Sequence, residues 1–130
     1  MTVQQLARGD SEKLITAVRA GLSFESFTML RDALGLSTND LAHLLGIPRR
    51  TLTKRQSEGT FKLSESNAIS RVARVYQEAL DFLSDEEDVL RWLKTPLPAL
   101  SATPLSLLDT DPGADAVSTL LTQLAWGLYP

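Results

Sequence analysis

The spacing of apolar residues constrains this chain more than any other feature of its sequence. Apolar side chains recur every three or four positions along nearly the whole chain, which is the rhythm of helices with one buried face. The longest such stretch begins behind a Ser64 cap and continues to about Leu83. No segment shows the strict alternation of a half-buried strand. The sequence therefore predicts an all-α fold.

Serine caps and glycine stops divide the rest of the chain into shorter helices. We expect helices between Ser11 and Gly21, between Ser23 and Gly35, and over 38–45, 49–57, 86–93, 104–108 and 114–126. Gly113 is expected to break the chain before the last helix, and three prolines make residues 95–104 a loop. We place the boundary between an N-terminal region, residues 1–62, and a C-terminal region, residues 63–130.

Charge is divided unevenly along the chain. Residues 1–74 hold 11 Lys and Arg against 7 Asp and Glu, whereas residues 75–130 hold 2 against 9. The formal charges of the two segments are therefore +4 and −7, in a chain whose net charge is −3. This asymmetry indicates two surfaces with different partners, of which the basic one is suited to phosphate contacts.

The residue inventory excludes several classes of protein. The chain has no cysteine and one histidine, so thiolate metal sites are ruled out and no metal or other cofactor is expected. No apolar run approaches the roughly 18 residues of a membrane span. The first residues lack the apolar core of a secretory signal. We therefore expect a cytoplasmic protein with no membrane partner.

Residues 37–55 carry the first functional signal, a helix-turn-helix pattern. Ala42 lies four residues before Gly46, so a small side chain faces the partner helix and glycine supplies the sharp turn. Ile47 and Leu52 are spaced to be buried between the two helices. Basic and hydroxyl side chains crowd the second helix, where N-terminal residues would reach base edges and the others phosphates. The predicted DNA-binding set is Arg49, Arg50, Thr53, Lys54 and Arg55.

The alternative interpretation is an ordinary helical hairpin with a solvated basic face. Even with the helix-turn-helix fold, DNA binding is a separate property, because a scaffold can be kept for dimerisation alone. One helix-turn-helix reads only a short site, so DNA binding implies a dimer or a larger assembly.

A second series of motifs lies in the C-terminal region. In chain order it runs Trp92-Leu93, Thr95-Pro96-Leu97-Pro98, Thr103-Pro104-Leu105, Leu107-Leu108-Asp109-Thr110, Gly113-Ala114 and Leu124-Ala125-Trp126-Gly127-Leu128-Tyr129. These motifs resemble the toxin-binding domain of the Xre/MbcA/ParS antitoxin family, in the branch that partners RES-domain toxins. The helix-turn-helix, with Arg50-Thr51-Leu52, is similar to the N-terminal half of the same family, and the resemblance covers residues 24–129.

The resemblance implies the antitoxin of a type II toxin–antitoxin pair, which acts by binding. RES toxins consume NAD, and the family's antitoxins cover the toxin and block its active site. Usually as dimers and together with toxin, they also bind the operator and repress their own operon. The implied partners are a RES-domain toxin, operator DNA and a second copy of the chain. The expected toxin-binding residues are Trp126, Leu128 and Tyr129. Trp126 and Tyr129 supply rigid aromatic anchors of the kind found at interfaces, and the resemblance implies that Leu128 and Tyr129 reach toward the NAD pocket of the toxin.

Two positions depart from the family's pattern. Ser101-Ala102 stands where the family usually has glycine before the Thr-Pro-Leu step. Asn67-Ala68 stands where an Asp-Arg pair tends to follow Glu65-Ser66. The second change removes two charges and the ion pair that they could form.

Other candidate residues have structural interpretations. Trp92 lies among apolar residues and is expected in the core, whereas Trp126 fits a core position or an interface equally well. The acidic run 85–88 opens a helix, where the helix dipole favours carboxylates without any partner. His43 is expected on the surface.

An enzyme is not expected, because the sequence has no glycine-rich phosphate loop and no recognisable nucleophile–histidine set. The main alternative function is an autonomous helix-turn-helix transcription regulator whose C-terminal half dimerises or senses a ligand. A third is an adaptor that has lost DNA binding, against which Arg49, Arg50 and Arg55 count. A RES-type toxin in the neighbouring reading frame would favour the antitoxin over the autonomous regulator.

Overall fold

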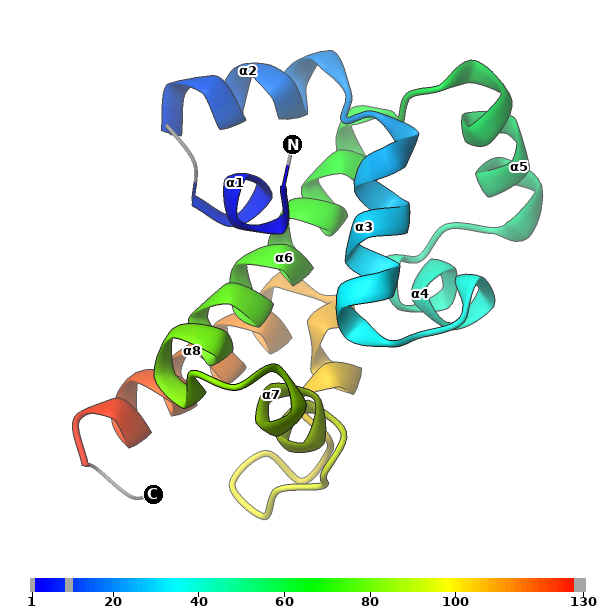
Figure 1. Ribbon diagram of the computed structural model, residues 1–130. Helices are drawn as coiled ribbons and strands as arrows, with labels where there is room; N and C mark the ends of the chain where they lie inside the picture. The colour runs from blue at the N-terminus through cyan, green and yellow to red at the C-terminus, as the bar shows by residue number, and fades with distance from the viewer. Residues whose placement is uncertain (1, 9–10, 128–130) are drawn as a thin grey trace. The chain divides into compact units, whose positions relative to one another are not determined.

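The computed structural model describes residues 2–8 and 11–127, most of which are α-helical (Figure 1). Within these residues no strand forms, and the two isolated bridges, Ser23–Thr60 and Leu97–Ala102, lie between helices. The predicted all-α fold is therefore confirmed. No helix in this part of the chain combines the length and the apolarity that a membrane span requires. The elements are α1 Val3–Arg8, α2 Ser11–Ala20, α3 Phe24–Leu34, α4 Thr38–Leu45, α5 Arg49–Glu58, α6 Leu63–Leu83, α7 Glu86–Leu93, the 3-10 helix η1 Leu105–Asp109 and α8 Asp111–Ala125.

Most helix boundaries follow the capping signals of the sequence. The hydroxyl of Ser37 caps α4 by accepting the amide of Asp40 at 3.0 Å, whereas Ser23 precedes α3 without such a bond. Helix α6 begins one residue before the expected cap at Ser64. The side chain of Ser11, expected to cap α2, lies outside the described residues.

The chain divides into two compact units, Met1–Arg74 and Val75–Pro130. The division lies inside α6, later than the boundary expected between residues 62 and 63, because the first half of α6 is bonded to N-terminal segments. The hydroxyl of Ser66 accepts the amide of Leu22 at 3.0 Å, and that of Ser70 donates to the carbonyl of Leu6 at 3.0 Å. The same division separates the segments of formal charge +4 and −7.

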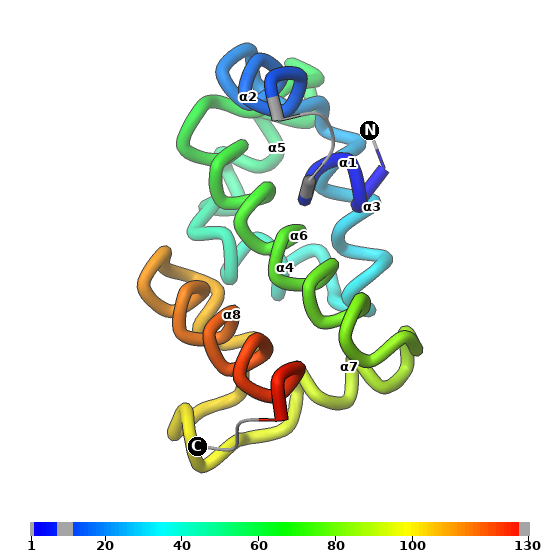
Figure 2. The backbone as a smooth tube through the Cα atoms, turned by 90° about the vertical axis from the view of Figure 1, so that its left-hand side faces the viewer, coloured from blue at the N-terminus to red at the C-terminus, as the bar shows by residue number. Residues whose placement is uncertain are grey.

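The core of the first unit is built around α3. Its buried side chains include Phe27, Leu30 and Leu34, and α1 packs beside it (Figure 2). The ring of Phe24 stacks on those of Phe27 and Phe61, with centroids 5.7 and 5.5 Å apart, and the Phe27 and Phe61 rings are tilted against each other at 6.1 Å. Because Phe61 follows α5, this aromatic cluster fixes the segment that leaves the helix-turn-helix.

The second unit contains the end of α6 together with α7, η1 and α8. Its helices begin at side-chain caps: Asp85 accepts the amides of Glu87 and Asp88, and Thr110 accepts the amide of Gly113 at 3.0 Å. The Asp85 cap agrees with the structural interpretation of the acidic run. Fully buried side chains at the core of this unit include Val89, Leu93, Leu108 and Val117.

The expectation that Gly113 breaks the chain is wrong. It lies in the first turn of α8, which begins at Asp111 rather than at Ala114. A Cβ atom at Gly113 would overlap the carbonyl oxygen of Leu107. Glycine is therefore required for the close approach of η1 to α8 and not to end a helix.

Candidate functional site

The helix-turn-helix pattern folds as the sequence predicts. Helices α4 and α5 are joined by residues 46–48, and Gly46 adopts the left-handed conformation with φ +71°. The amide of Ile47 bonds to the carbonyl of Ala42 at 2.9 Å, which closes the end of α4. Ala42, Ile47 and Leu52 are all buried. The turn therefore holds the second helix of the pair in a defined place.

Helix α5 presents its polar residues to solvent. Leu52 is its one buried residue, while the side chains of Arg49, Arg50, Thr53 and Lys54 are exposed. With 3.6 residues per turn, Arg50 and Lys54 point away from Leu52, and Thr53 lies to one side of it. Four of the five predicted DNA-binding residues thus form one exposed surface.

The start of α4 extends this surface. The guanidinium of Arg49 donates to the side-chain oxygen of Asn39 at 3.2 Å, and Arg31 donates to the hydroxyl of Thr38 at 3.1 Å. Together with Thr53 and Gln56 of α5, Thr38 and Asn39 line a hollow between the two helices. Thr38, Asn39 and Gln56 were not among the residues predicted from the sequence. Only their place in the helix-turn-helix could have indicated them, because the first turn of α4 lies beside the face of α5 that carries Arg49.

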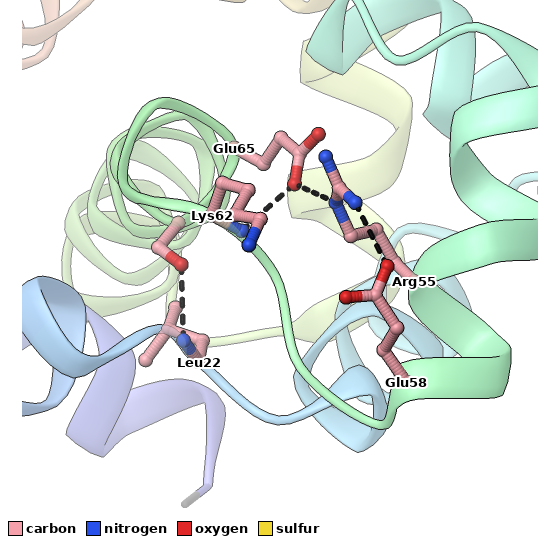
Figure 3. A network of polar contacts seen from close by, with 6 residues as sticks. Leu22, Arg55, Glu58, Lys62 and Glu65 are labelled. Atoms are coloured by element: carbon pink, nitrogen blue, oxygen red, sulfur yellow. Dashed lines mark hydrogen bonds and ion pairs between the residues drawn. The ribbon is translucent and has the colours of Figure 1, made fainter.

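Arg55 departs from the predicted set, because its guanidinium turns toward α6 (Figure 3). Its Nε donates to Oε1 of Glu65 at 2.7 Å, and its Nη1 donates to Oε1 of Glu58 at 3.1 Å. Only 12% of the Arg55 side chain and 13% of the Glu65 side chain are exposed. We therefore correct the expectation that Arg55 contacts DNA: it belongs to an internal ion-pair network.

The network sets the protonation of its members. Burial alone would raise the pKa of Glu65, but hydrogen bonds from Arg55 and from the amide of Lys62 outweigh it and lower that pKa. The pKa of Arg55 is raised by its hydrogen bond to Glu65. Both groups are therefore charged at neutral pH.

The second unit exposes apolar side chains near its C-terminal end. Trp126, directly after α8, is 78% exposed, and Phe82 in α6 is 40% exposed. Phe82 and Ala125 line a shallow hollow between the ends of α6 and α8. Its other lining residues are Glu78, Asp81, Leu121 and Thr122.

Leu128 and Tyr129, expected to bind the toxin, lie outside the described residues. Trp92 is half-buried beside the fully buried Leu93, and His43 is exposed as expected. Among the described residues no group of three or more potential ligands could hold a metal ion.

Comparisons with known proteins match both units. Residues 13–74 match the antitoxin Xre-like helix-turn-helix domain, and residues 78–127 match the antitoxin Xre/MbcA/ParS C-terminal toxin-binding domain. The two matched segments therefore lie on either side of the division between the units.

Two curated relatives are similar over much of the chain. One is the protein named antitoxin Xre in Yersinia enterocolitica serotype O:8 / biotype 1B, 31% identical over 89% of this chain and 80% of the relative. Another is the protein of the same name in Photorhabdus laumondii subsp. laumondii, 36% identical over 68% of this chain and 62% of the relative. The chain thus spans less than two thirds of the Photorhabdus protein.

Proposed function

This chain belongs to the Xre family of antitoxins, and from that premise we propose that it neutralises a RES-domain, NAD-consuming toxin and represses its own operon. The proposal assigns one partner to each unit, with the toxin on the second unit and operator DNA on the first. The observation that carries it is the coincidence of two compact units, two family matches and two opposite charges.

DNA binding is assigned to the exposed face of α5. Arg49 and Arg50 at its N-terminal end are placed to read base edges, since arginine can make paired hydrogen bonds to guanine. Lys54 is assigned to phosphate contact and Thr53 to either base or phosphate. Asn39 holds the guanidinium of Arg49 at 3.2 Å, which orders that side chain before it meets DNA.

A homodimer is part of the proposal, because one α5 helix covers too short a site for specific repression. Two copies related by a two-fold axis would read two half-sites. Light scattering on the purified chain tests this step, with a mass of two chains expected and a mass of one chain contradicting it.

Toxin binding is assigned to the end of the second unit. The toxin's NAD site must hold phosphates and therefore needs cationic groups, to which a unit of formal charge −7 is complementary. Burying an aromatic side chain such as Trp126 stabilises a complex by about 1.5–3 kcal/mol. Beside it, the hollow at Phe82 combines apolar walls with the carboxylates of Glu78 and Asp81. We extend the toxin-binding set of Trp126, Leu128 and Tyr129 by Phe82.

An autonomous transcription regulator is the alternative function. Such a protein would need its second unit only for dimerisation or ligand sensing, and it would have no toxin to neutralise. The match of residues 78–127 to a toxin-binding domain favours the antitoxin.

Co-expression with the RES-domain product of the neighbouring reading frame tests the toxin assignment. We expect the full chain to restore growth and to co-purify with the toxin. Phe82→Lys should weaken that complex, because the change removes an apolar contact and places a cation where the toxin is proposed to be cationic. Ile15→Lys is the matched control, since Ile15 is 50% exposed but lies in the first unit. Equal loss in both variants, or no complex with the unchanged chain, would contradict the assignment.

A further inference from the structure

Helix α5 buries little of its own surface for a helix that must aim side chains at DNA. The turn at Gly46 and the aromatic cluster of Phe61 hold the chain at its two ends, but Leu52 is the one buried residue among its ten. One buried side chain does little to oppose rotation of the helix about its own axis. A second anchor on the same face would fix that rotation. Arg55 occupies this position, three residues after Leu52 and therefore on the same face.

The anchor of Arg55 is Glu65 in the first turn of α6. Its Oε1 accepts Nε of Arg55 at 2.7 Å and also the amide of Lys62 at 2.8 Å (Figure 3). Lys62 directly precedes α6, so the second bond is the reciprocal half of a capping box. One carboxylate oxygen therefore joins α5 to the fixed start of α6.

The start of α6 is itself held in place. The hydroxyl of Ser66 accepts the amide of Leu22 at 3.0 Å, so the residue after Glu65 is bonded to the segment that precedes α3. A continuous path of hydrogen bonds thus runs from α5 through α6 to the core of the first unit. The little-exposed side chains of Arg55 and Glu65 make this link stronger than a surface ion pair. Glu58, whose side chain is 37% exposed, adds a weaker contact to Arg55.

From this arrangement we propose that Glu65 is a positioning residue for DNA recognition: through Arg55 it fixes the rotation of α5 and so aims Arg49 and Arg50. The inference rests on the proposed binding of operator DNA by α5. This positioning role predicts the opposite of what simple electrostatics predicts for the loss of a carboxylate. Removal of a carboxylate from a DNA-binding unit ordinarily tightens binding, because repulsion from the phosphates is reduced. At Glu65 the same removal should weaken specific binding.

The test compares two variants that lose the same charge. Glu65→Ala removes the anchor, whereas Glu25→Ala removes an exposed carboxylate from α3, outside the network. The full chain is titrated against a duplex of the DNA upstream of its own gene and against a scrambled duplex of equal length and composition. We expect Glu65→Ala to weaken binding to the upstream duplex by roughly tenfold or more, the scale of a lost charge-assisted hydrogen bond. Binding to the scrambled duplex should stay the same or tighten.

Glu25→Ala should bind both duplexes as well as the unchanged chain or slightly better. Glu65→Gln keeps an acceptor oxygen for Arg55 and Lys62, and it should fall between Glu65→Ala and the unchanged chain. If the alanine variant does not fold, the glutamine variant decides the test. Arg55 and Glu65 depend on each other, so the double variant Arg55→Gln, Glu65→Gln should lose less binding free energy for the upstream duplex than the two single variants added together.

Two results separate the inference from the function on which it rests. If the unchanged chain does not distinguish the upstream duplex from the scrambled one, operator binding itself is wrong. If it does distinguish them and Glu65→Ala or a folded Glu65→Gln binds the upstream duplex as tightly as Glu25→Ala, the positioning role is overturned.

Discussion

The two units are both helical, but their exposed helices are held in place in different ways. In the first unit α5 buries only Leu52 and relies on the ion pairs of Arg55. In the second, α8 buries Ala114, Val117, Leu120 and Leu121 and leaves its aromatic residue, Trp126, at the exposed end. A surface that meets phosphates must keep its cations outside, so little apolar area remains to anchor it. A surface that meets protein can combine a buried apolar face with an exposed aromatic anchor.

Loss of the C-terminal tail should have the largest effect. Truncation after Trp126 should abolish protection in a growth-rescue assay, because Leu128 and Tyr129 are proposed to reach toward the NAD site of the toxin. The truncated chain should stay helical by circular dichroism and should still dimerise, since α8 ends at Ala125. Full protection would show that the tail is not the blocking element. If the truncated chain unfolds, Tyr129→Ala alone replaces it in the assay.

The second largest effect is expected from removal of the two arginines that are proposed to read bases, which should impair the function of the first unit alone. Arg49→Ala with Arg50→Ala should weaken operator binding while toxin neutralisation remains intact. Loss of one arginine that makes paired hydrogen bonds to a base weakens the free energy of specific binding by about 1–3 kcal/mol. Affinity of the unchanged chain should also fall steeply with salt, because phosphate contacts release counterions. If the double variant and the unchanged chain gave the same mobility-shift titration, α5 would have a role other than DNA binding.

Substitution of single glycines should act on one unit at a time. Gly113→Ala should destabilise the second unit by about 1–3 kcal/mol, because its Cβ would overlap the carbonyl oxygen of Leu107. Gly46→Ala is the control in the first unit: nothing lies within 4 Å of its Cβ, so only the cost of the left-handed conformation, about 1 kcal/mol, remains. Chemical denaturation measures both changes. A smaller loss for Gly113→Ala than for Gly46→Ala would contradict the tight approach of η1 to α8.

The smallest expected effect is the contribution of Glu65, in the first unit, to acid sensitivity. The pKa of Glu65 is lowered on folding, so its ion pair stabilises the protein at neutral pH and is lost as pH falls below the ordinary value of 4.5 toward the lowered one. Denaturation at pH 6 and at pH 4 should therefore show a smaller pH-dependent loss of unfolding free energy in Glu65→Gln than in the unchanged chain. Equal losses would show that Glu65 does not contribute to acid sensitivity.

The positions of most helices could be predicted from the sequence, because apolar rhythm, serine caps and glycine stops are local signals. Helix α1 was missed, since its six residues are too few to establish a rhythm. The division between the two compact units has no glycine or proline to mark it in the sequence, because it lies within the continuous helix α6.

The residues that were misread depend on contacts with a neighbouring helix rather than within their own. Gly113 has the same signature whether it ends a helix or admits a neighbouring carbonyl, and only the fold brings Leu107 beside it. Arg55 resembles the other cations of α5 by composition. Its spacing from Leu52 indicated the buried face, but the acceptor that completes its pairing, Glu65, lies ten residues away. The exposure of the other four residues proposed to bind DNA could be predicted from the sequence, because solvent exposure on a helix follows its period.

The central claim is that the second unit neutralises a RES-domain toxin while the first binds DNA. Its most direct test is the rate of NAD consumption by the purified product of the neighbouring gene, which is proposed to be a RES-domain toxin, titrated with the full chain. We predict that NAD consumption falls to the background rate at a fixed ratio of chain to toxin, and that the Arg49→Ala, Arg50→Ala double variant inhibits equally well. The account would be contradicted if NAD consumption continued unchanged at a saturating concentration of the chain. It would also be contradicted if the double variant failed to inhibit the toxin.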